Sequence, residues 1–590
     1  MVCSTEAPRG GAFLIEPVTE REPFIREDFG PDDEHFAAIA DAFVAKEVLP
    51  RIDAIEAQEP GLMPHLLKRA GELGLLMLEI PSEYGGLGVS KTVALLVAAR
   101  GSVCGSFSVS WTAHTGIGSL PLVLYGTDEQ RARYLPRLAT GEWLAAYALS
   151  EPGSGSDALG AKAKAVLSAD GSTYRLNGVK QFITNAGFAD LFTVFAKVDG
   201  EKFTAFLIER ATPGVSIGPE EHKLGIKGSS TCQLILEDVD VPVANVLGTI
   251  GAGHKIAFNI LNIGRLKLGG IATEGAKGSL HEAMRYAVAR KQFQTPIVQF
   301  GAIQRKIADM AARIYASESM TYRTAGLLDA GCERLDRGAA SYWSDVQKVT
   351  EEFAIEQSIL KVYGSETLDF CVDETLQMLG GYGYIEEYGF ARRYRDSRIN
   401  RIFEGTNEIN RLLIPGTLMK RAMTGALPLL DFIHHVHAEL DAPPANDSSA
   451  LLAAEQAALD GAKRLTAYAA GVLVEREPAD LSRKQQHLEL FSDMICEVYA
   501  LDSALGRTLK LIRQRGADAC AAEIDLTRLV AADTSERFSQ AARRLLSNDA
   551  ETATRHLGAM AKLCSYVPVG SLDLKTRVAE RIIAQYQPAT

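Results

Sequence analysis

The chain has 590 residues and a formal net charge of −12, with 47% hydrophobic and 23% charged residues. A chain of this length is expected to form more than one domain, and this composition is typical of globular proteins. The acidic charge argues against a general nucleic-acid-binding protein. An anionic small molecule can still be bound by a local group of arginines or backbone N–H groups.

Cysteine usage and the uncharged stretches suggest an intracellular protein. The eight cysteines include no Cys-x-x-Cys pair, so neither a zinc ribbon nor a dithiol redox motif is predicted. Acidic residues throughout the first 30 positions argue against a secretory signal or a transit peptide. The longest uncharged stretch, 101–127, contains His114 and Pro121 and predicts a buried core segment, not a membrane span. We expect a cytoplasmic protein without a targeting segment.

Residues 33–146 are predicted to form an N-terminal helical domain, after an extension at 1–32. Apolar residues recur at helical spacing in "HFAAIADAFVAKEVLPRI" and "MPHLLKRAGELGLLML". The stretch "PSEYGGLG", 81–88, predicts a turn between helices.

Residues 147–250 are predicted to form a middle antiparallel β domain. Short runs rich in β-branched and aromatic residues, such as "LFTVFAKV" and "CQLILEDVDVP", alternate with Asn-Gly, Asp-Gly and Pro-Gly turns. Strands and helices do not alternate here, which argues against a doubly wound fold.

Residues 251–420 return to long helical patterns and are predicted to form a C-terminal four-helix-bundle domain. The stretch "DAPPANDSS" lies in a linker predicted at 421–450. Beyond it, apolar residues again fall on one helical face, which predicts an additional helical domain at 451–590. The expected fold class is therefore α+β, mostly α.

Two motifs of the β domain are suited to a flat ligand with polar edges. "YALSEPGSGSDA", 147–158, offers backbone and hydroxyl donors in a tight loop, although a surface turn has the same composition. "KQFITNAG", 180–187, places Phe182 and Thr184 on one face of a strand, as an ordinary core strand also would.

Two motifs of the later helical region are suited to a phosphorylated ligand. "ARKQF", 289–293, places Arg290 and Phe293 one helical turn apart, although a solvated arginine fits the same pattern. "QMLGGYGY", 377–384, contains glycines that permit close backbone approach but also end helices. These glycines are Gly380, Gly381 and Gly383.

Two further matches are set aside. "GVSIG", 214–218, fits Gly-x-Ser-x-Gly, but prolines flank it and no helical pattern follows, so a nucleophile elbow is not predicted. "HHVH", 434–437, has no further metal ligands nearby in sequence, so a solvated helix face is preferred to a metal site.

The stretch "RIFEGTNEINR", 401–411, contains a candidate general base. Gly405 interrupts the helical pattern and Thr406 is a good N-cap for the helix that follows. Glu404 therefore lies at a junction, where its apolar neighbours could raise its pKa into the range of a usable base. An exposed helix-end acid fits the same residues, and the local sequence does not decide between the two.

Taken together, six segments resemble the motifs of the acyl-CoA dehydrogenase family, in the family's order. The resemblance covers about residues 35–420, and the chain after 440 resembles the extra helical domain of the very-long-chain branch. The six segments are "YALSEPGSGSDA", "KQFITNAGFAD", "EDVDVPVANVLG", "ARKQF", "QMLGGYGY" and "RDSRINRIFEGTNEINR".

The resemblance implies an enzyme with FAD as cofactor that oxidises a medium- to long-chain fatty acyl-CoA to trans-2-enoyl-CoA, the first step of β-oxidation. Glu404 matches the family's base, which removes the α-proton while the β-hydride passes to the flavin. Some members carry the base on an earlier helix, where this chain has Gly264. Electrons would pass to an electron-transfer flavoprotein. An oxidase that uses O₂ and a non-catalytic scaffold of the same fold are the alternatives.

The resemblance also implies binding residues, position by position. Phe182 stands where many members have Trp, and Glu408 where many have Gln. The cofactor contacts would be Leu149, Ser150, Ser156, Phe182, Thr184, Arg290, Phe293, Gln377, Gly380, Gly381, Thr406 and Glu408. The substrate contacts would be Ser156, Asn262, Arg265 and Glu404. No metal is expected.

Two expectations concern assembly. The resemblance implies a homodimer in which some cofactor contacts cross the subunit boundary. Very-long-chain members attach peripherally to membranes, but residues 422–461 of this chain contain neither Lys nor Arg. An electrostatic anchor is therefore poorly supported, and we expect a mostly soluble protein with weak or absent membrane association.

Overall fold

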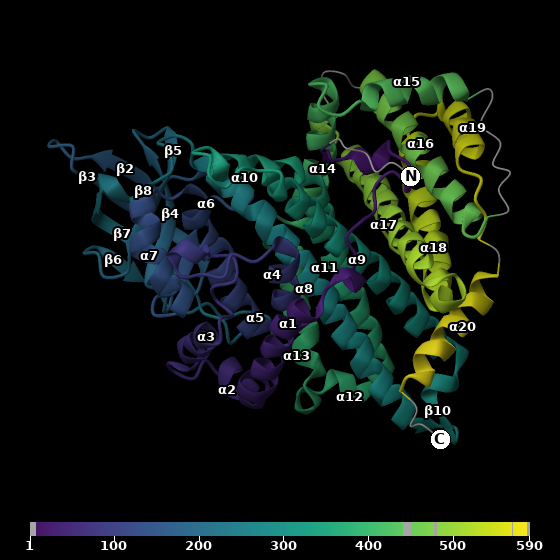
Figure 1. Ribbon diagram of the computed structural model, residues 1–590, viewed down its shortest axis with the longest axis horizontal. Coiled ribbons are helices and arrows are strands. Elements are labelled where there is room, and N and C mark those ends of the chain that lie inside the picture. Colours follow the sequence, from purple (N-terminus) through teal and green to yellow (C-terminus); the bar gives the residue numbers. More distant parts are fainter. Residues whose placement is uncertain (1–6, 441–449, 477–480, 569, 587–590) are drawn as a thin grey trace.

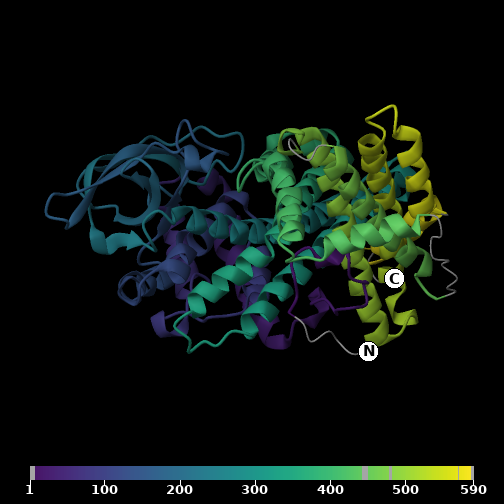
Figure 2. The same cartoon turned by 90° about the horizontal axis from the view of Figure 1, so that it is seen from above.

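The computed structural model describes residues 7–440, 450–476, 481–568 and 570–586. The linker stretch "DAPPANDSS", 441–449, lies outside the described residues. Along the chain the elements run from helices to a sheet and back to helices, so the predicted α+β, mostly α, fold is confirmed. The sheet lies at one end of the molecule and the last helices at the other (Figure 1, Figure 2).

The first helices surround the uncharged segment 101–127, which packs in the interior as predicted. α7 begins with a capping box between Thr127 and Gln130 and ends at Gly141 in the left-handed conformation. No helix among the described residues is long and apolar enough to cross a membrane. The helices are α1 (Pro31–Phe43), α2 (Ile52–Glu56), α3 (Leu62–Glu72), α4 (Lys91–Arg100), α5 (Gly105–Thr112), α6 (Leu120–Tyr125) and α7 (Asp128–Thr140), with a π-helical turn at Ala113–Gly118.

The middle region forms an eight-stranded sheet in the order β6-β7-β3-β2-β4-β5-β8, with β1 paired to β4. Most pairs are antiparallel, as predicted, but β4 is parallel to β1 and β2, because neither is joined to it by a hairpin. The "GVSIG" motif forms the edge strand β6. The strands are β1 (Ala145–Ala148), β2 (Lys164–Leu167), β3 (Thr173–Thr184), β4 (Leu191–Val198), β5 (Lys202–Glu209), β6 (Val215–Ile217), β7 (Thr231–Pro242) and β8 (Val246–Leu247).

Long helices follow the sheet, and α8 packs along α9 and α11 in the middle of the molecule (Figure 1). Apolar residues of α8 pack against the sheet, and those of α8, α9 and α11 pack against the last helices. The helices are α8 (Gly253–Ala289), α9 (Gly301–Glu333), α10 (Tyr342–Glu352), α11 (Ala354–Leu379), α12 (Gly381–Tyr384), α13 (Phe390–Ser397) and α14 (Asn407–Met423).

The expected helical spacing in "ARKQF" is wrong. α8 ends at Ala289, and the chain turns back through the small hairpin of β9 (Lys291–Gln292) and β10 (Thr295–Pro296). Phe293 and Gln294 form the turn with φ of 49° and 65°. Two consecutive left-handed residues are what a two-residue hairpin requires, and Pro296 is incompatible with a continuing helix.

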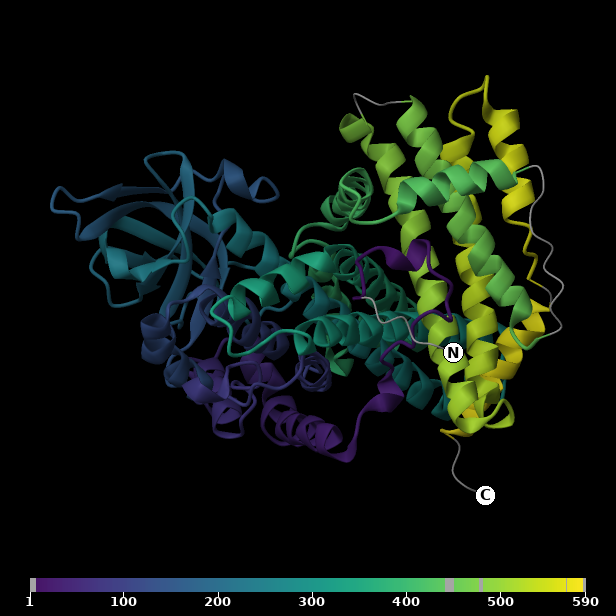
Figure 3. The same ribbon diagram turned by 45° about the horizontal axis from the view of Figure 1, so that its top comes forward.

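The remaining helices cover one side of α9, α11 and α14 (Figure 1, Figure 3). One hydrophobic cluster contains residues of both the bundle and these helices, so the two share a continuous core. "HHVH" lies on α15. The helices are α15 (Leu429–Glu439), α16 (Ala453–Arg476), α17 (Gln485–Arg515), α18 (Ala521–Leu546), α19 (Ala553–Leu563) and α20 (Ser571–Ala584).

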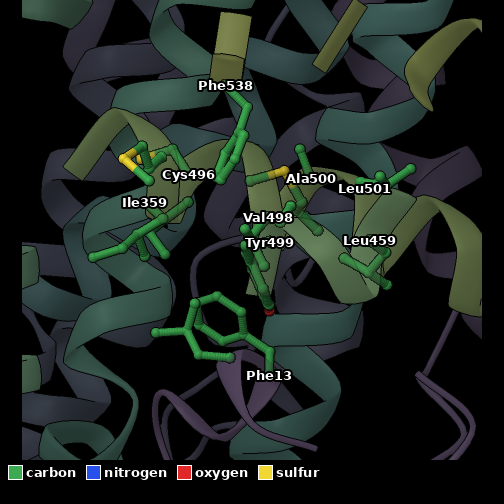
Figure 4. Packing of buried hydrophobic residues seen from close by; sticks show 14 of the residues in the cluster. Phe13, Ile359, Leu459, Cys496, Val498, Tyr499, Ala500, Leu501 and Phe538 are labelled. Atoms are coloured by element: carbon green, nitrogen blue, oxygen red, sulfur yellow. The ribbon is translucent and has the colours of Figure 1, made fainter. Parts of the chain in front are cut away.

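Residues 9–29, which we call the N-terminal strap, run between the bundle and α17 (Figure 3). Phe13 packs on Tyr499 of α17 with ring centroids 4.5 Å apart, and Ile359 of α11 lies beside them (Figure 4). The strap thus contributes an aromatic side chain to the core between bundle and C-terminal helices.

Candidate active site

A cavity of about 1520 Å³ lies where the sheet, α5, α8 and the segment before α14 meet. It brings together many of the residues singled out in the sequence. Those lining it are Leu149, Ser150, Ser156, Phe182, Thr184, Asn262, Arg265, Glu404 and Thr406.

The other singled-out residues lie elsewhere. A smaller cavity of about 600 Å³ is lined by Arg290, Gly380 and Gly381, beside the β9–β10 hairpin. Phe293, at the tip of that hairpin, is 90% exposed, and Gln377 and Glu408 are exposed outside both cavities. Within one chain, the two groups of residues are therefore separate.

The loop after β1 is fixed from beneath by a buried ion pair. Lys180 Nζ lies 2.7 Å from Glu151 Oε1 and also donates to the Leu149 carbonyl oxygen at 3.2 Å. Glu151 accepts the backbone N–H groups of Lys162 and Ala163 as well. Burial favours the neutral acid, but these bonds hold the pKa of Glu151 below its ordinary value. The loop is thereby held rigidly beside the cavity.

The end of β3 carries an aromatic ring into the same cavity. The pairing of β3 with β7 shifts register between Lys180 and Ile183, and Phe182 has φ of 58°, so the strand bulges there. The Gln181 N–H donates to the Ser150 carbonyl oxygen at 2.9 Å, which ties the bulge to the first loop. Phe182 is 64% exposed and lines the cavity, a costly arrangement for an aromatic unless a ligand covers it.

Glu404 lies in a backbone turn between two helical segments. Its φ of 59° and that of Gly405, 78°, end the preceding helical turn. The predicted N-cap is confirmed, since Thr406 Oγ1 accepts the Ile409 N–H at 3.2 Å at the start of α14. A left-handed glutamate is uncommon, and such strain is held where the surroundings dictate it.

The carboxylate of Glu404 points at α8, opposite Gly264. A Cβ at position 264 would stand 2.7 Å from its carboxyl atoms, so any larger residue would displace the carboxylate from this position. Gly264 therefore makes room for the acid that occupies this part of the cavity.

The charge of Glu404 is set by burial opposed by two cations. Burial raises the pKa of Glu404 to about 7, although Arg265 and Lys361 act in the opposite direction. Among the residues that the structure describes, its Oε2 has no hydrogen-bond partner. A carboxylate that titrates near neutrality without donors of its own is suited to accept a proton.

Arg265 binds the backbone of Glu404, not its carboxylate. Its Nε donates to the Glu404 carbonyl oxygen at 3.1 Å, and its Nη1 donates to Asn262 Oδ1 at 2.7 Å. Burial lowers the pKa of Arg265 to about 10, so it stays charged at neutral pH. It fixes the turn while leaving the carboxylate free.

Lys361 was not foreseen from the sequence. It is fully buried on α11, donates to Asn407 Oδ1 at 2.7 Å, and burial lowers its pKa to about 7. A single lysine in a long helix carries no local signal of burial in the sequence, so only the packing of α11 against its neighbours, α14 among them, reveals it.

Models of one protein family match successive segments along most of the chain. The models of the acyl-CoA dehydrogenase N-terminal, middle and C-terminal domains match residues 30–142, 146–239 and 251–419. A second acyl-CoA dehydrogenase C-terminal domain model matches residues 461–561. Each of the three main segments of the fold is thus matched in order.

Individual relatives agree. A probable acyl-CoA dehydrogenase of Bacillus subtilis is 46% identical over 98% of this chain and 98% of its own. The mitochondrial very long-chain specific acyl-CoA dehydrogenase of Bos taurus is 39% identical over 67% of this chain and 57% of its own. A crystal structure of an acyl-CoA dehydrogenase complexed with FAD from Bacillus anthracis is 44% identical, with a TM-score of 0.96 over 99% of this chain and 100% of that one.

Proposed function

The chain belongs to the acyl-CoA dehydrogenase family, and we propose that it is an FAD-dependent enzyme converting medium- to long-chain fatty acyl-CoA to trans-2-enoyl-CoA. The observation that carries the proposal is Glu404, which lines the large cavity, has its pKa raised to about 7, and has a buried Oε2 without a hydrogen-bond partner among the described residues. Burial and a near-neutral pKa are the properties required of a base that removes a carbon-bound proton.

The residues around the cavity fit a flavin. An aromatic ring that stands exposed in a cavity, beside the hydroxyls of Ser150 and Thr184, suits one face and the polar edge of a flat ring system. Leu149, Ser156 and Thr406 would complete the set on this chain. When bound, FAD supplies the redox chemistry by accepting the hydride from the β-carbon.

The chain's own residues would act on the substrate as follows. Glu404 accepts the α-proton on a carboxylate oxygen, in a site where burial strengthens its basicity. Arg265, anchored by Asn262, holds the Glu404 carbonyl and so orients the turn that carries the base. Gly264 leaves the space in which the carboxylate approaches the substrate carbon.

Assembly and electron transfer belong to the same proposal. Arg290, Gly380 and Gly381 lie away from the Glu404 cavity, which supports a homodimer in which they contact the partner's FAD. Phe293, Gln377 and Glu408, exposed outside both cavities, would join these contacts from the surface. The family assignment supports electron-transfer flavoprotein as the acceptor.

Replacing the base tests the proposal. Glu404→Gln keeps the size and removes the proton acceptor, so dehydrogenation of acyl-CoA should fall by at least ~10²-fold while FAD stays bound. The measurement is dye-coupled acyl-CoA oxidation at matched FAD content. A variant that keeps near wild-type turnover would show that Glu404 is not the base.

A further inference from the structure

The cavity extends well beyond Glu404, along α8. Gly264 and Gly278 both line it, and about four helical turns, or ~21 Å, separate them. Residues of α5 and the π-helical turn after it, among them Val109 and Ala113, line the same cavity. We call the part of the cavity between Gly264 and Gly278 its limb. A long linear acyl chain that reacts at Glu404 would extend along it.

Apolar side chains line the middle of the limb, together with the charged residues Lys267 and Glu274. Leu268 and Ile271 of α8 line it together with Leu368 and Val372 of α11. These side chains suit the methylene groups of an acyl chain, which gain free energy by leaving water.

The far end of the limb is cationic. Arg392 and Arg393 of α13 line it beside Cys104, and Arg393 Nη1 lies 3.9 Å from the position that a Cβ on Gly278 would take. Neither guanidinium forms an ion pair or side-chain hydrogen bond with any residue in the described ranges, whereas Arg395 of the same helix pairs with Glu386. We call Cys104, Gly278, Arg392 and Arg393 the distal end.

The carboxylates near the distal end are committed to other groups or lie beyond contact. Asp396 accepts the Ile226 N–H and attracts Arg392 electrostatically without an ion pair, and Glu274 pairs with Lys277 at 3.2 Å. Glu282 attracts Arg393 electrostatically but forms no ion pair with it. At the place where an acyl chain would terminate, the two guanidinium groups therefore have carboxylates in their surroundings but no ion-pair or side-chain hydrogen-bond partner among the described residues. Burial lowers the pKa of Arg393, in keeping with a partly desolvated cation.

A methyl terminus would remove water from these guanidinium groups without replacing its hydrogen bonds, which is unfavourable. A carboxylate would replace them with charge-assisted bonds, for which the planar guanidinium is well suited. We propose that the distal end binds a carboxylate at the ω-terminus of the acyl chain, so that the enzyme prefers long ω-carboxyacyl-CoA substrates to unsubstituted ones of equal length. Arg393 is the main specificity residue, and Arg392 supports it. This inference rests on the proposed function.

The test compares palmitoyl-CoA with hexadecanedioyl-CoA, which differ only at the ω-carbon, on the FAD-loaded full-length enzyme. The ratio of their kcat/KM values should favour hexadecanedioyl-CoA by about 10-fold or more, the range of a hydrogen bond between charged groups. Arg393→Met should reduce that ratio by a similar factor, and Arg393→Lys should retain part of it.

Arg285→Met is the matched control, because Arg285 is an exposed cation of α8 that lines neither cavity. It should leave the ratio unchanged. A wild-type enzyme with equal kcat/KM for both substrates, or with a preference for palmitoyl-CoA, would overturn the inference even if no variant folds. An unchanged ratio in folded Arg393→Met would do the same. If neither substrate is oxidised, the proposed function fails instead.

Discussion

At the scale of single residues, the activity of the site depends on the pKa of Glu404, which burial raises and nearby cations lower. Burial alone favours the protonated acid, which cannot act as a base. Arg265 and Lys361 oppose it and keep the pKa of Glu404 at about 7. Since the acid must be ionised to accept a proton, kcat/KM should rise with pH through about 7 and level off above it.

Lys361→Met tests this balance. The lysine lowers the pKa of Glu404, so its removal should move the acidic limb of the kcat/KM profile to higher pH and leave less activity at neutral pH. The measurement is kcat/KM as a function of pH, with an acyl-CoA that saturates the enzyme at accessible concentrations. Lys68→Met, at an exposed position of α3, should leave the limb in place. If the acidic side of the kcat/KM profile is unchanged or shifts to lower pH, the role given to Lys361 is wrong.

The sequence predicted which residue types form this site, but it did not predict how they are arranged. Glu404 was recognised because an acid before Gly-Thr, in an ordered set of motifs, limits the choices. The free Oε2, the bond from Arg265 to the Glu404 carbonyl and the buried Lys361 depend on contacts between α8, α11 and α14. Residues far apart in the chain make those contacts, and no local pattern encodes them.

At the scale of elements, α17 is joined to the strap by charge pairs that differ in burial. Arg507 is buried, lies 2.6 Å from Glu27 and 2.8 Å from Glu318 of α9, and covers the ring of Tyr315. Arg513, nearly two turns later, lies 2.8 Å from Glu22, and these side chains are 39% and 50% exposed. The first pair connects three elements through the interior, and the second lies at the surface.

Arg507→Met should destabilise the protein by about 3–5 kcal/mol, because it removes a buried cation from Glu27 and leaves the buried Glu318 with Lys277 alone. Arg513→Met should cost at most about 1 kcal/mol, because water screens the exposed pair. Thermal unfolding, together with hydrogen exchange of residues 9–29, measures both. Equal effects of the two substitutions would show that burial does not decide the strength of these pairs.

Periodicity predicted the long helices of the C-terminal region but not the strap. Helical faces repeat over many residues, so α16 and α17 were evident from the sequence. The strap has no such repeat, and the carboxylates of Glu22, Glu27 and Asp28 only suggested the absence of a targeting segment. In the fold, these acids are the partners of basic residues on α17, nearly 500 positions away.

At the scale of the whole molecule, the strap connects the part of the bundle that carries the base to the C-terminal helices. The Gly10 N–H donates to Glu352 Oε1 at 2.9 Å, and the Gly11 N–H donates to Glu356 Oε1 at 2.7 Å. Glu352 also pairs with Arg421 of α14, the helix that Glu404 precedes. Displacement of the strap should therefore lower the stability of both the bundle and the C-terminal helices that share this core.

Gly10→Ala tests this connection with the smallest possible change. A Cβ at position 10 would stand 1.9 Å from the Glu352 carbonyl oxygen, so the strap must move away from α10 to accept it. We expect a loss of about 1–3 kcal/mol, as for other overpacked contacts, seen as a lower Tm and faster proteolysis within residues 9–29. Gly30→Ala is the matched control, since the nearest atom there, Asp33 Oδ2, lies 3.8 Å away. If both variants unfold and are cleaved like the wild type, the strap does not join the two halves, and the C-terminal helices are held by their apolar contacts alone.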